Sequence, residues 1–289
     1  VSTPPFEIAV TPLRSILASL LVVLLPAAGD AATGAWSTTD HVGIRLIAAQ
    51  SAPGVPLQAA IEIVLDPGWK TYWRTPGDAG IPPRFDFSGS ENASGADVAF
   101  PAPERSDDGF SVSNVYHDRV VLPVSFAQTD PSQPVQLELT ANLGICADVC
   151  VPINLSASLD VSPGAPDDGA MAAITAARAA LPGPGRAGAF AVTGLERAGG
   201  SDKLPEFEVT VMAPDPVATT LFVEMPPDWY PAPPEPETAS GGPVRYRIAV
   251  DRKTATTPLD GAVVRLTMTS NGEAATRAFR LGPDGQAVS

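Results

Sequence analysis

Residues 142–152, with the sequence NLGICADVCVP, contain both cysteines of the 289-residue chain, Cys146 and Cys150. A disulfide holds its two Cα atoms about 4.4–6.8 Å apart, whereas an extended strand separates residues four apart by roughly 13 Å. A bridge between the two cysteines therefore requires residues 147–149 to turn, and Asp148 is of a type that stabilises turns. The stretch predicts a tight loop or hairpin tip in which two sulfur atoms face each other.

The short spacing of the cysteines indicates what a bridge between them is for. A disulfide that closes so short a loop stabilises a fold by only about 2 kcal/mol, against almost 5 kcal/mol for a loop of about a hundred residues. A staple for stability would join distant strands, so the spacing favours a reversible redox pair. Two alternatives stay open at this point, a static local bridge and a metal site made of two thiolates.

The residues around this stretch show the alternation of short β-strands. Apolar residues recur at every second position and are bounded by Pro, Gly, Asp and Ser, a pattern typical of an antiparallel β-sandwich. The expected strands are residues 41–48, 57–65, 119–126, 135–143 and 153–161. The two cysteines lie between the last two of them, at the edge of the expected sandwich. We take residues 32–163 as the first domain.

Residues 164–188 differ from this pattern. Asp167 and Asp168 can begin a helix, the Ala-rich residues 170–181 continue it, and Pro182 ends it. We expect this segment to connect the first domain to a second β-sandwich, residues 189–289. Its expected strands are residues 206–212, 220–225, 244–250, 262–269 and 275–281, with a Pro-rich loop at residues 226–236. This second half contains no cysteine or histidine, and we assign no chemistry to it.

The N-terminus has the pattern of a secretory signal peptide. Arg14 precedes an apolar run, residues 16–25, which is followed by small residues. The run is too short for a permanent membrane helix, which needs about 20 residues. We expect residues 1–31 to be removed by cleavage near Ala31 and the mature protein to be periplasmic, where disulfides persist. The alternatives are a buried helix and an uncleaved anchor.

The composition excludes several classes of partner. The formal net charge is −14, without a basic cluster, which argues against nucleic acid or anionic lipid as a partner. With 44% hydrophobic residues the chain can build cores. The 32 prolines and 25 glycines suit many short strands separated by turns, and therefore an all-β fold.

Two further stretches are expected near the cysteines. Residues 68–83, GWKTYWRTPGDAGIPP, carry Trp69, Tyr72 and Trp73, which form either part of an ordinary core or an apolar wall around the sulfurs. Residues 101–116, PAPERSDDGFSVSNVY, read as a polar loop that carries Phe110, either a packing anchor or a lid.

These two stretches and residues 142–152, in this order, resemble the periplasmic N-terminal domain of the DsbD/ScsB family, and the ScsB-type branch most closely. The resemblance covers residues 36–161, and with weaker motifs it extends to the connector and the second sandwich. It implies an immunoglobulin-like fold for both sandwiches and a thiol:disulfide oxidoreductase of the protein-disulfide reductase type. It places Cys146 and Cys150 at the redox pair and Phe110 at an aromatic cap loop. Tyr72, Trp73 and Tyr116, together with Trp69, fall in its aromatic surround.

The chain departs from the family pattern after the second sandwich. Family members continue into a membrane domain and a thioredoxin-like domain, whereas this chain ends at Ser289. The resemblance therefore implies that electrons are exchanged with separate proteins, namely thioredoxin-like periplasmic proteins and a separate membrane electron transporter. The cysteine spacing is also tighter than in DsbD itself.

The residues and the resemblance together predict thiol–disulfide exchange, which needs no cofactor and no metal. The 142–152 stretch contains no Lys, Arg or His that would lower a thiol pKa, so activation has to come from the folded surroundings. The resemblance favours Cys150 as the attacking residue. One alternative is a Cu(I)-binding copper-tolerance protein that uses both cysteines, and another is a non-enzymatic adaptor. A zinc site is not expected, because the only histidines are His41 and His117.

Overall fold

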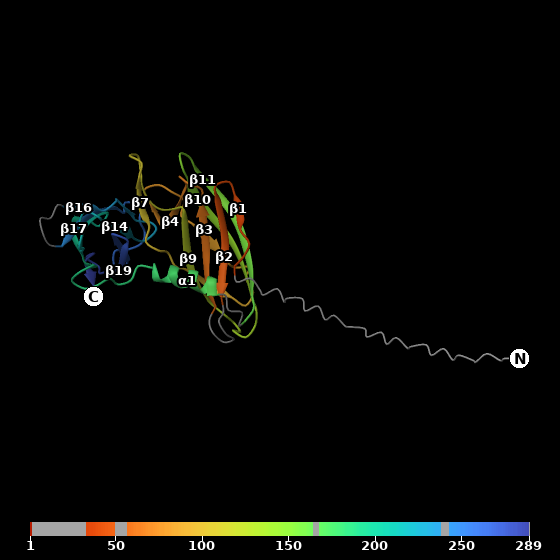
Figure 1. Cartoon of the computed structure of the whole chain (residues 1–289). Helices are drawn as coiled ribbons and strands as arrows, with labels where there is room; N and C mark the ends of the chain where they lie inside the picture. Colours follow the sequence, from red (N-terminus) through yellow and green to blue (C-terminus); the bar gives the residue numbers. More distant parts are fainter. Residues whose placement is uncertain (2–32, 50–56, 164–167, 238–242, 289) are drawn as a thin grey trace.

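The computed structural model describes residue 1 and residues 33–49, 57–163, 168–237 and 243–288. The expected signal peptide and the first part of the connector lie outside these residues. The regular structure of the described chain is almost all β-strand, with one short helix, and forms two sandwich-like domains, which Figure 1 shows side by side. The expected all-β class is thereby confirmed. Within the described ranges, helical segments fall short of the length and apolar content that a membrane crossing requires.

The first domain consists of two sheets that face each other. One sheet has the strand order β1-β2-β3-β9-β6 and the other β11-β10-β4-β8-β7, with β5 paired to β10. The strands are β1 (Ser37–Thr39), β2 (Val42–Ala49), β3 (Gln58–Leu65), β4 (Lys70–Gly77), β5 (Arg84–Asp86), β6 (Ser94–Val98), β7 (Glu104–Asp107), β8 (Val112–His117), β9 (Arg119–Ala127), β10 (Val135–Cys146) and β11 (Cys150–Val161).

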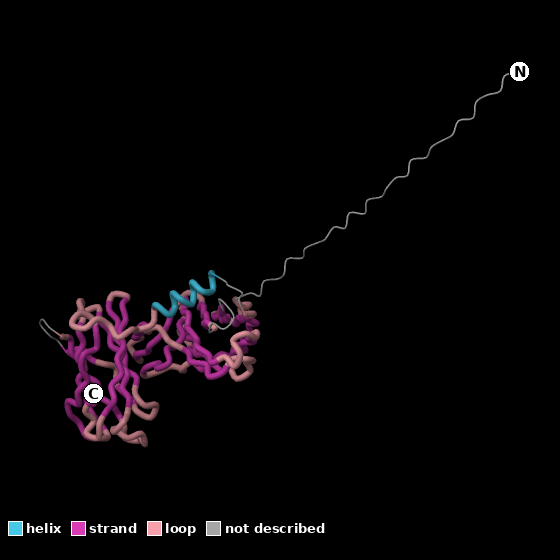
Figure 2. Tube along the Cα trace, turned by 90° about the horizontal axis from the view of Figure 1, so that it is seen from below, coloured by secondary structure: helices cyan, strands magenta, loops and turns pink. Residues whose placement is uncertain are grey.

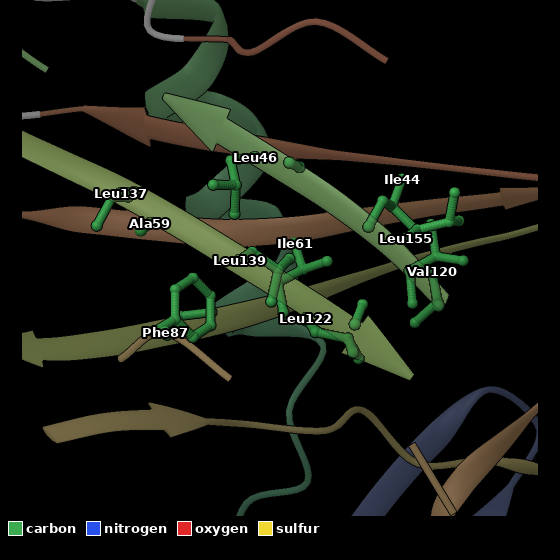
Figure 3. Packing of buried hydrophobic residues seen from close by; sticks show 14 of the residues in the cluster. Ile44, Leu46, Ala59, Ile61, Phe87, Val120, Leu122, Leu137, Leu139 and Leu155 are labelled. Atoms are coloured by element: carbon green, nitrogen blue, oxygen red, sulfur yellow. The ribbon is translucent and has the colours of Figure 1, made fainter. Parts of the chain in front are cut away.

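The core of this domain lies between the two sheets. Because side chains alternate across a strand, every second residue of β10 faces inward, as with the buried Leu137 and Leu139. These residues pack against Ile44 and Ile61 of the opposite sheet, and Figure 3 shows how the two layers meet.

Three strands, β4, β7 and β8, lie in stretches that the sequence predicts as turn or loop. Residues 68–83 read as a turn-rich segment, yet they contain β4, and residues 101–116 read as a polar loop, yet they contain β7 and most of β8. β4 does not show the alternation of aliphatic residues that predicts a strand. Its inward face consists of Thr71 and Trp73, and its outward face carries Lys70 and Tyr72. Because of these polar and aromatic residues, the sequence pattern does not predict β4, although β4 is the central strand of its sheet.

The single described helix, α1 (Asp168–Ala179), covers the outer face of the first sheet. Its buried residues Ala170 and Ile174 pack against Ile47, Ala49 and Ala60 of β2 and β3. Figure 2 shows the helix lying along the first domain. The segment expected as a connector therefore also contributes to the packing of the first domain.

The second domain again has two sheets. Their strand orders are β12-β13-β17-β15, with β16 paired to β17, and β14-β18-β19-β20. The strands are β12 (Ala191–Ser201), β13 (Leu204–Met212), β14 (Thr219–Glu224), β15 (Tyr230–Pro231), β16 (Glu235–Glu237), β17 (Val244–Asp251), β18 (Val263–Ser270), β19 (Glu273–Leu281) and β20 (Ala287–Val288). The expected Pro-rich loop, residues 226–236, contains β15 and most of β16.

A cavity of about 870 Å³ lies between the two domains. Residues 74–78 of the first domain line one side, and residues 225–227 and 229–234 of the Pro-rich segment line the other. The second domain therefore borders the first one beside β4.

Candidate functional site

The two cysteines lie at the tip of the long hairpin formed by β10 and β11. Cys146 and Cys150 are the last pair of this antiparallel ladder, and residues 147–149 form the turn between them. The sulfur atoms are joined in a disulfide, with the Cα atoms 4.1 Å apart. The structure thus has the turn that the cysteine spacing predicts.

The disulfide lies outside the main core. Leu143 and Ile145 of β10 point into the core, so the alternation of the strand places Gly144 and Cys146 on the opposite, outer face. Cys146 is 6% exposed and forms a small cluster with Tyr72 and Val115 on that face. A disulfide on the outer face does not hold the two sheets together, and it remains within reach of another protein.

The two cysteines differ in accessibility. Cys146 is buried, whereas Cys150, the first residue of β11, is exposed. Its neighbours Val149 and Val151 are 68% and 39% exposed, so the surface next to Cys150 is apolar. An incoming sulfur atom therefore meets Cys150 before Cys146.

Tyr72 contacts the disulfide directly. Its hydroxyl oxygen lies 3.2 Å from Sγ of Cys150, and because a disulfide sulfur carries no hydrogen, the tyrosine hydroxyl donates this hydrogen bond. Burial raises the pKa of Tyr72, and the carboxylate of Asp108 raises it further. Tyr72 therefore stays protonated at neutral pH, and its hydroxyl can also donate a hydrogen bond to the thiolate form of Cys150.

Two glycines hold the ring of Tyr72 in place. A Cβ atom added to Gly80 would meet the ring at 2.5 Å, and one added to Gly144 would meet it at 3.0 Å and Ile81 at 2.7 Å. Gly80 also has a φ of +134°, which side chains with a Cβ rarely adopt. The close approach of the backbone on two sides fixes the ring, and with it the hydroxyl that reaches Cys150.

Lys70 is a neighbour of the site that the sequence analysis missed. It is directly opposite Cys146 in the β4–β10 ladder, so both side chains leave the same face of the sheet. Its ammonium group donates to Oγ of Ser106, 2.9 Å away. A nearby cation favours a thiolate over a thiol. No local pattern could have revealed this neighbour, because it depends on the pairing of strands far apart in the sequence.

The other expected aromatic residues of the surround lie elsewhere. Trp73 and Tyr116 belong to the main core, and the Tyr116 hydroxyl donates to the carbonyl of Pro101 at 2.6 Å. Trp69 packs at the edge of this core and stacks on His41, with ring centroids 4.2 Å apart. Trp69 and Trp73 thus lie where the ordinary-core interpretation of their stretch expects them, and Tyr116 also lies in the core, whereas Tyr72 faces the sulfurs.

Phe110 lies in the turn between β7 and β8 and is 99% exposed. The carboxylate of Asp108 accepts the backbone N–H groups of Phe110 and Ser111 at 3.0 and 2.8 Å and so shapes this turn. Figure 1 shows the tips of the β7–β8 and β10–β11 hairpins at the same end of the domain. In this conformation the ring of Phe110 covers no other residue, so its role as a lid stays a prediction.

Two comparisons relate this chain to known proteins. Residues 45–159 match the family described as thiol:disulfide interchange protein DsbD, N-terminal. The chain is also similar to the crystal structure of the N-terminal periplasmic domain of ScsB from Proteus mirabilis, with 22% sequence identity and a TM-score of 0.71, over 87% of this chain and 99% of that one. No curated protein matches. Residues 45–159 are therefore similar to the N-terminal domain of DsbD, and the chain has the fold of the ScsB periplasmic domain.

Proposed function

We propose that this protein is a periplasmic thiol:disulfide interchange protein that passes electrons through Cys146 and Cys150 to or from thioredoxin-like partners. The observation that carries the proposal is the disulfide at the hairpin tip, outside the core, with one exposed sulfur residue and a tyrosine hydroxyl bonded to it. The match of residues 45–159 to the DsbD N-terminal family supports the same chemistry. A separate membrane electron transporter is a further partner in this proposal.

The exchange proceeds through a mixed disulfide. In the reduced protein the thiolate of Cys150 attacks one sulfur of a partner disulfide; a bond forms between Cys150 and that sulfur, and the other partner sulfur leaves as a thiolate and takes up a proton. The thiolate of Cys146 then attacks Sγ of Cys150 and releases the second partner thiolate. The partner gains two electrons, and the Cys146–Cys150 disulfide is formed. The reverse sequence reduces the pair again.

The assignment of Cys150 to the mixed disulfide rests on accessibility and on Tyr72. Cys150 is exposed, and the Tyr72 hydroxyl can donate to its thiolate, which makes Cys150 the better attacking and leaving group toward a partner. Cys146, buried beside Val115, is placed to resolve the intermediate without itself meeting the partner.

Removing the resolving thiol tests this proposal. In exported protein from cells, Cys146→Ser should accumulate a mixed disulfide with a thioredoxin-like protein through Cys150, because the second attack is no longer possible. Cys150→Ser should accumulate far less, and the double variant should accumulate none. Non-reducing electrophoresis with mass spectrometry of the adducts measures this. If neither single variant forms an adduct while the wild-type dithiol binds Cu(I) tightly, the copper-binding alternative replaces the proposal.

Phe110 can be tested in the same experiment. As a lid, it would limit which thiols reach Cys150, so adding Phe110→Ala to Cys146→Ser should broaden the set of trapped proteins. Val217→Ala is the control, because Val217 is similarly exposed, at 96%, but belongs to the second domain. An unchanged set of adducts would remove Phe110 from the site.

A further inference from the structure

Strand β14 of the second domain is buried on both of its faces. Leu221 and Val223 point into the core of the second domain, whereas Phe222, which is 1% exposed, belongs to the core of the first domain. The alternation of a strand produces this arrangement, since neighbouring residues point to opposite sides. One strand therefore completes the cores of both domains.

The residues of β14 that face the first domain contact β4. The ring of Phe222 lies edge-on to Trp73, with centroids 6.0 Å apart. Glu224 accepts two hydrogen bonds from the guanidinium group of Arg74, at 2.6 and 2.8 Å. Such a bidentate pair fixes orientation as well as distance. Trp73 and Arg74 directly follow Tyr72, whose hydroxyl reaches Cys150.

A third contact ties β14 to the strand next to the site. The guanidinium group of Arg105 in β7 donates to the backbone carbonyl of Leu221 at 2.6 Å and lies 5.1 Å from the ring centroid of Phe222. Arg105 is thus held between the two domains, and the β7–β8 hairpin, which carries Asp108 and Phe110, is anchored to the second domain at its base.

The ladder of β4 is interrupted where the second domain makes contact. β4 pairs with β8 up to Tyr72 opposite Val115, and the pairing resumes only at Gly77 opposite Ser113. Residues 73–76 therefore bulge out of the ladder, and the contacts from Phe222 and Glu224 fall on this bulge. The chain then returns to the site at Gly80, whose backbone lies against the ring of Tyr72. The bulge thus links Tyr72 to Gly80, one of the two glycines that hold its ring.

From this arrangement we propose that the second domain is part of the redox site: Phe222 and Glu224 are positioning residues that hold the β4 bulge, and through it the hydroxyl of Tyr72, against Cys150. The proposal builds on the proposed exchange function and gives the second domain, which lacks cysteine and histidine, a role in it. When these contacts are lost, the Tyr72 hydroxyl is no longer held at hydrogen-bond distance, and the thiolate of Cys150 loses a donor.

The test measures the thiolate of Cys150 in the reduced full-length Cys146→Ser protein by ultraviolet titration. Phe222→Ala and Glu224→Gln should each lower the thiolate fraction near neutral pH by about threefold to tenfold, because a hydrogen bond to a charged group is lost. Exchange with oxidised glutathione should slow less, by about threefold for a tenfold loss of thiolate, since a thiolate of higher pKa is more nucleophilic. Circular dichroism confirms that each variant is folded.

Two control experiments distinguish a positioning role of Phe222 and Glu224 from a general destabilisation of the protein. Glu273→Gln removes an equally bidentate pair, with Arg186 at 3.0 and 2.8 Å, away from the domain junction, and should leave the thiolate unchanged. In a Tyr72→Phe background, Phe222→Ala and Glu224→Gln should have no further effect, because the donor is already missing. If Phe222→Ala does not fold, Glu224→Gln alone tests the proposal.

The outcomes distinguish this proposal from the exchange function. An unchanged thiolate fraction in folded Glu224→Gln and Phe222→Ala protein would overturn it, and so would an equal effect in the Tyr72→Phe background. The titration does not require a partner protein. It therefore gives a result even if the wild-type protein exchanges disulfides with no partner. In that case the exchange function fails while the positioning role is still decided.

Discussion

Tyr72 combines a buried ring with a hydroxyl that reaches an exposed sulfur. Its ring lies between the backbones of Gly80 and Gly144, and its hydroxyl donates to Cys150. Burial, and secondarily Asp108, raise the pKa of Tyr72, so the donor stays protonated over the range in which thiols titrate. We therefore expect Tyr72 to stabilise the thiolate of Cys150 more than the thiol in the reduced protein.

Replacing Tyr72 by Phe removes this donor without removing the ring. In the reduced Cys146→Ser protein we expect the pKa of Cys150 to rise by about one unit, because a hydrogen bond to a charged group contributes about 1.5–3 kcal/mol and part of it is regained from water. Ultraviolet titration of the thiolate measures the change. Tyr116→Phe is the matched control, since the Tyr116 hydroxyl donates to Pro101 inside the core. Equal pKa values in the two variants would contradict the role of Tyr72.

Glu62 is a buried charged residue of the first domain. Its side chain is 4% exposed and accepts from Arg45 and Arg119, each at 2.6 Å. Burial alone would raise the pKa of Glu62, but the hydrogen bonds and charges of the two arginines outweigh burial and lower the pKa below 4.5. A carboxyl group with a lowered pKa in the folded state contributes stability above its unfolded pKa, and this contribution is lost as the pH falls through the folded pKa.

Glu62→Gln should therefore destabilise the protein by about 1–3 kcal/mol at neutral pH, because two arginines lose a buried partner. The difference from wild type should shrink as the pH falls below 4.5, the ordinary pKa of a glutamate, because the unfolded chain then binds a proton that folded Glu62, with its lowered pKa, binds only at lower pH. Urea unfolding at several pH values measures both effects. The exposed Glu196, changed to Gln, provides the control. A difference that grows toward acidic pH would contradict this assignment.

The β10–β11 hairpin, which carries the disulfide, is also held by strand pairing and by the core. The two strands pair along their full length, from Val135 opposite Val161 to Cys146 opposite Cys150, and their inward side chains join the main core. The disulfide closes only the turn at the end of this ladder. Strand pairing and burial already hold the tip in place.

Removing both sulfurs should consequently cost little stability. We expect the Cys146→Ser, Cys150→Ser double variant to fold and to lose about 2 kcal/mol or less relative to the oxidised wild type, because the closed loop is so short. Denaturant unfolding of the two proteins gives the difference. A loss of cooperative unfolding in the double variant would show that the bridge is a structural staple rather than a redox pair.

The N-terminal segment and the proposed chemistry both indicate the compartment in which the protein acts. The expected signal peptide, residues 1–31, lies outside the described residues. The proposed chemistry requires a compartment in which a disulfide can form and be reduced by a dedicated partner.

We therefore expect the mature periplasmic protein to begin near Ala32 and to stay soluble after cell disruption, because the apolar run is too short for a permanent anchor. N-terminal sequencing of protein from the periplasmic fraction measures the start. Recovery of residues 1–25 in the membrane fraction would show that the segment is an anchor.

Local sequence patterns predicted much of this protein. The spacing of Cys146 and Cys150 requires a turn, and the alternation in residues 135–143 and 153–161 predicts the strands on either side of it. These are properties of neighbouring residues, decided by the geometry of the strand and of the disulfide. The all-β class and the existence of a helix near residues 170–181 follow from the same kind of pattern.

Contacts between distant segments required the folded structure. Tyr72 and Trp73 are adjacent aromatics, and which of them faces the sulfurs depends on how β4 pairs with β10, about which neither sequence segment carries local information. The same holds for Lys70 opposite Cys146. Phe222 reads as one more apolar residue of a second-domain strand, yet it fills the core of the first domain. A periodic pattern specifies which residues share a face of a strand. It does not specify which surface that face packs against, because burial is favourable against any apolar surface. Only the complete fold determines which apolar surface is available.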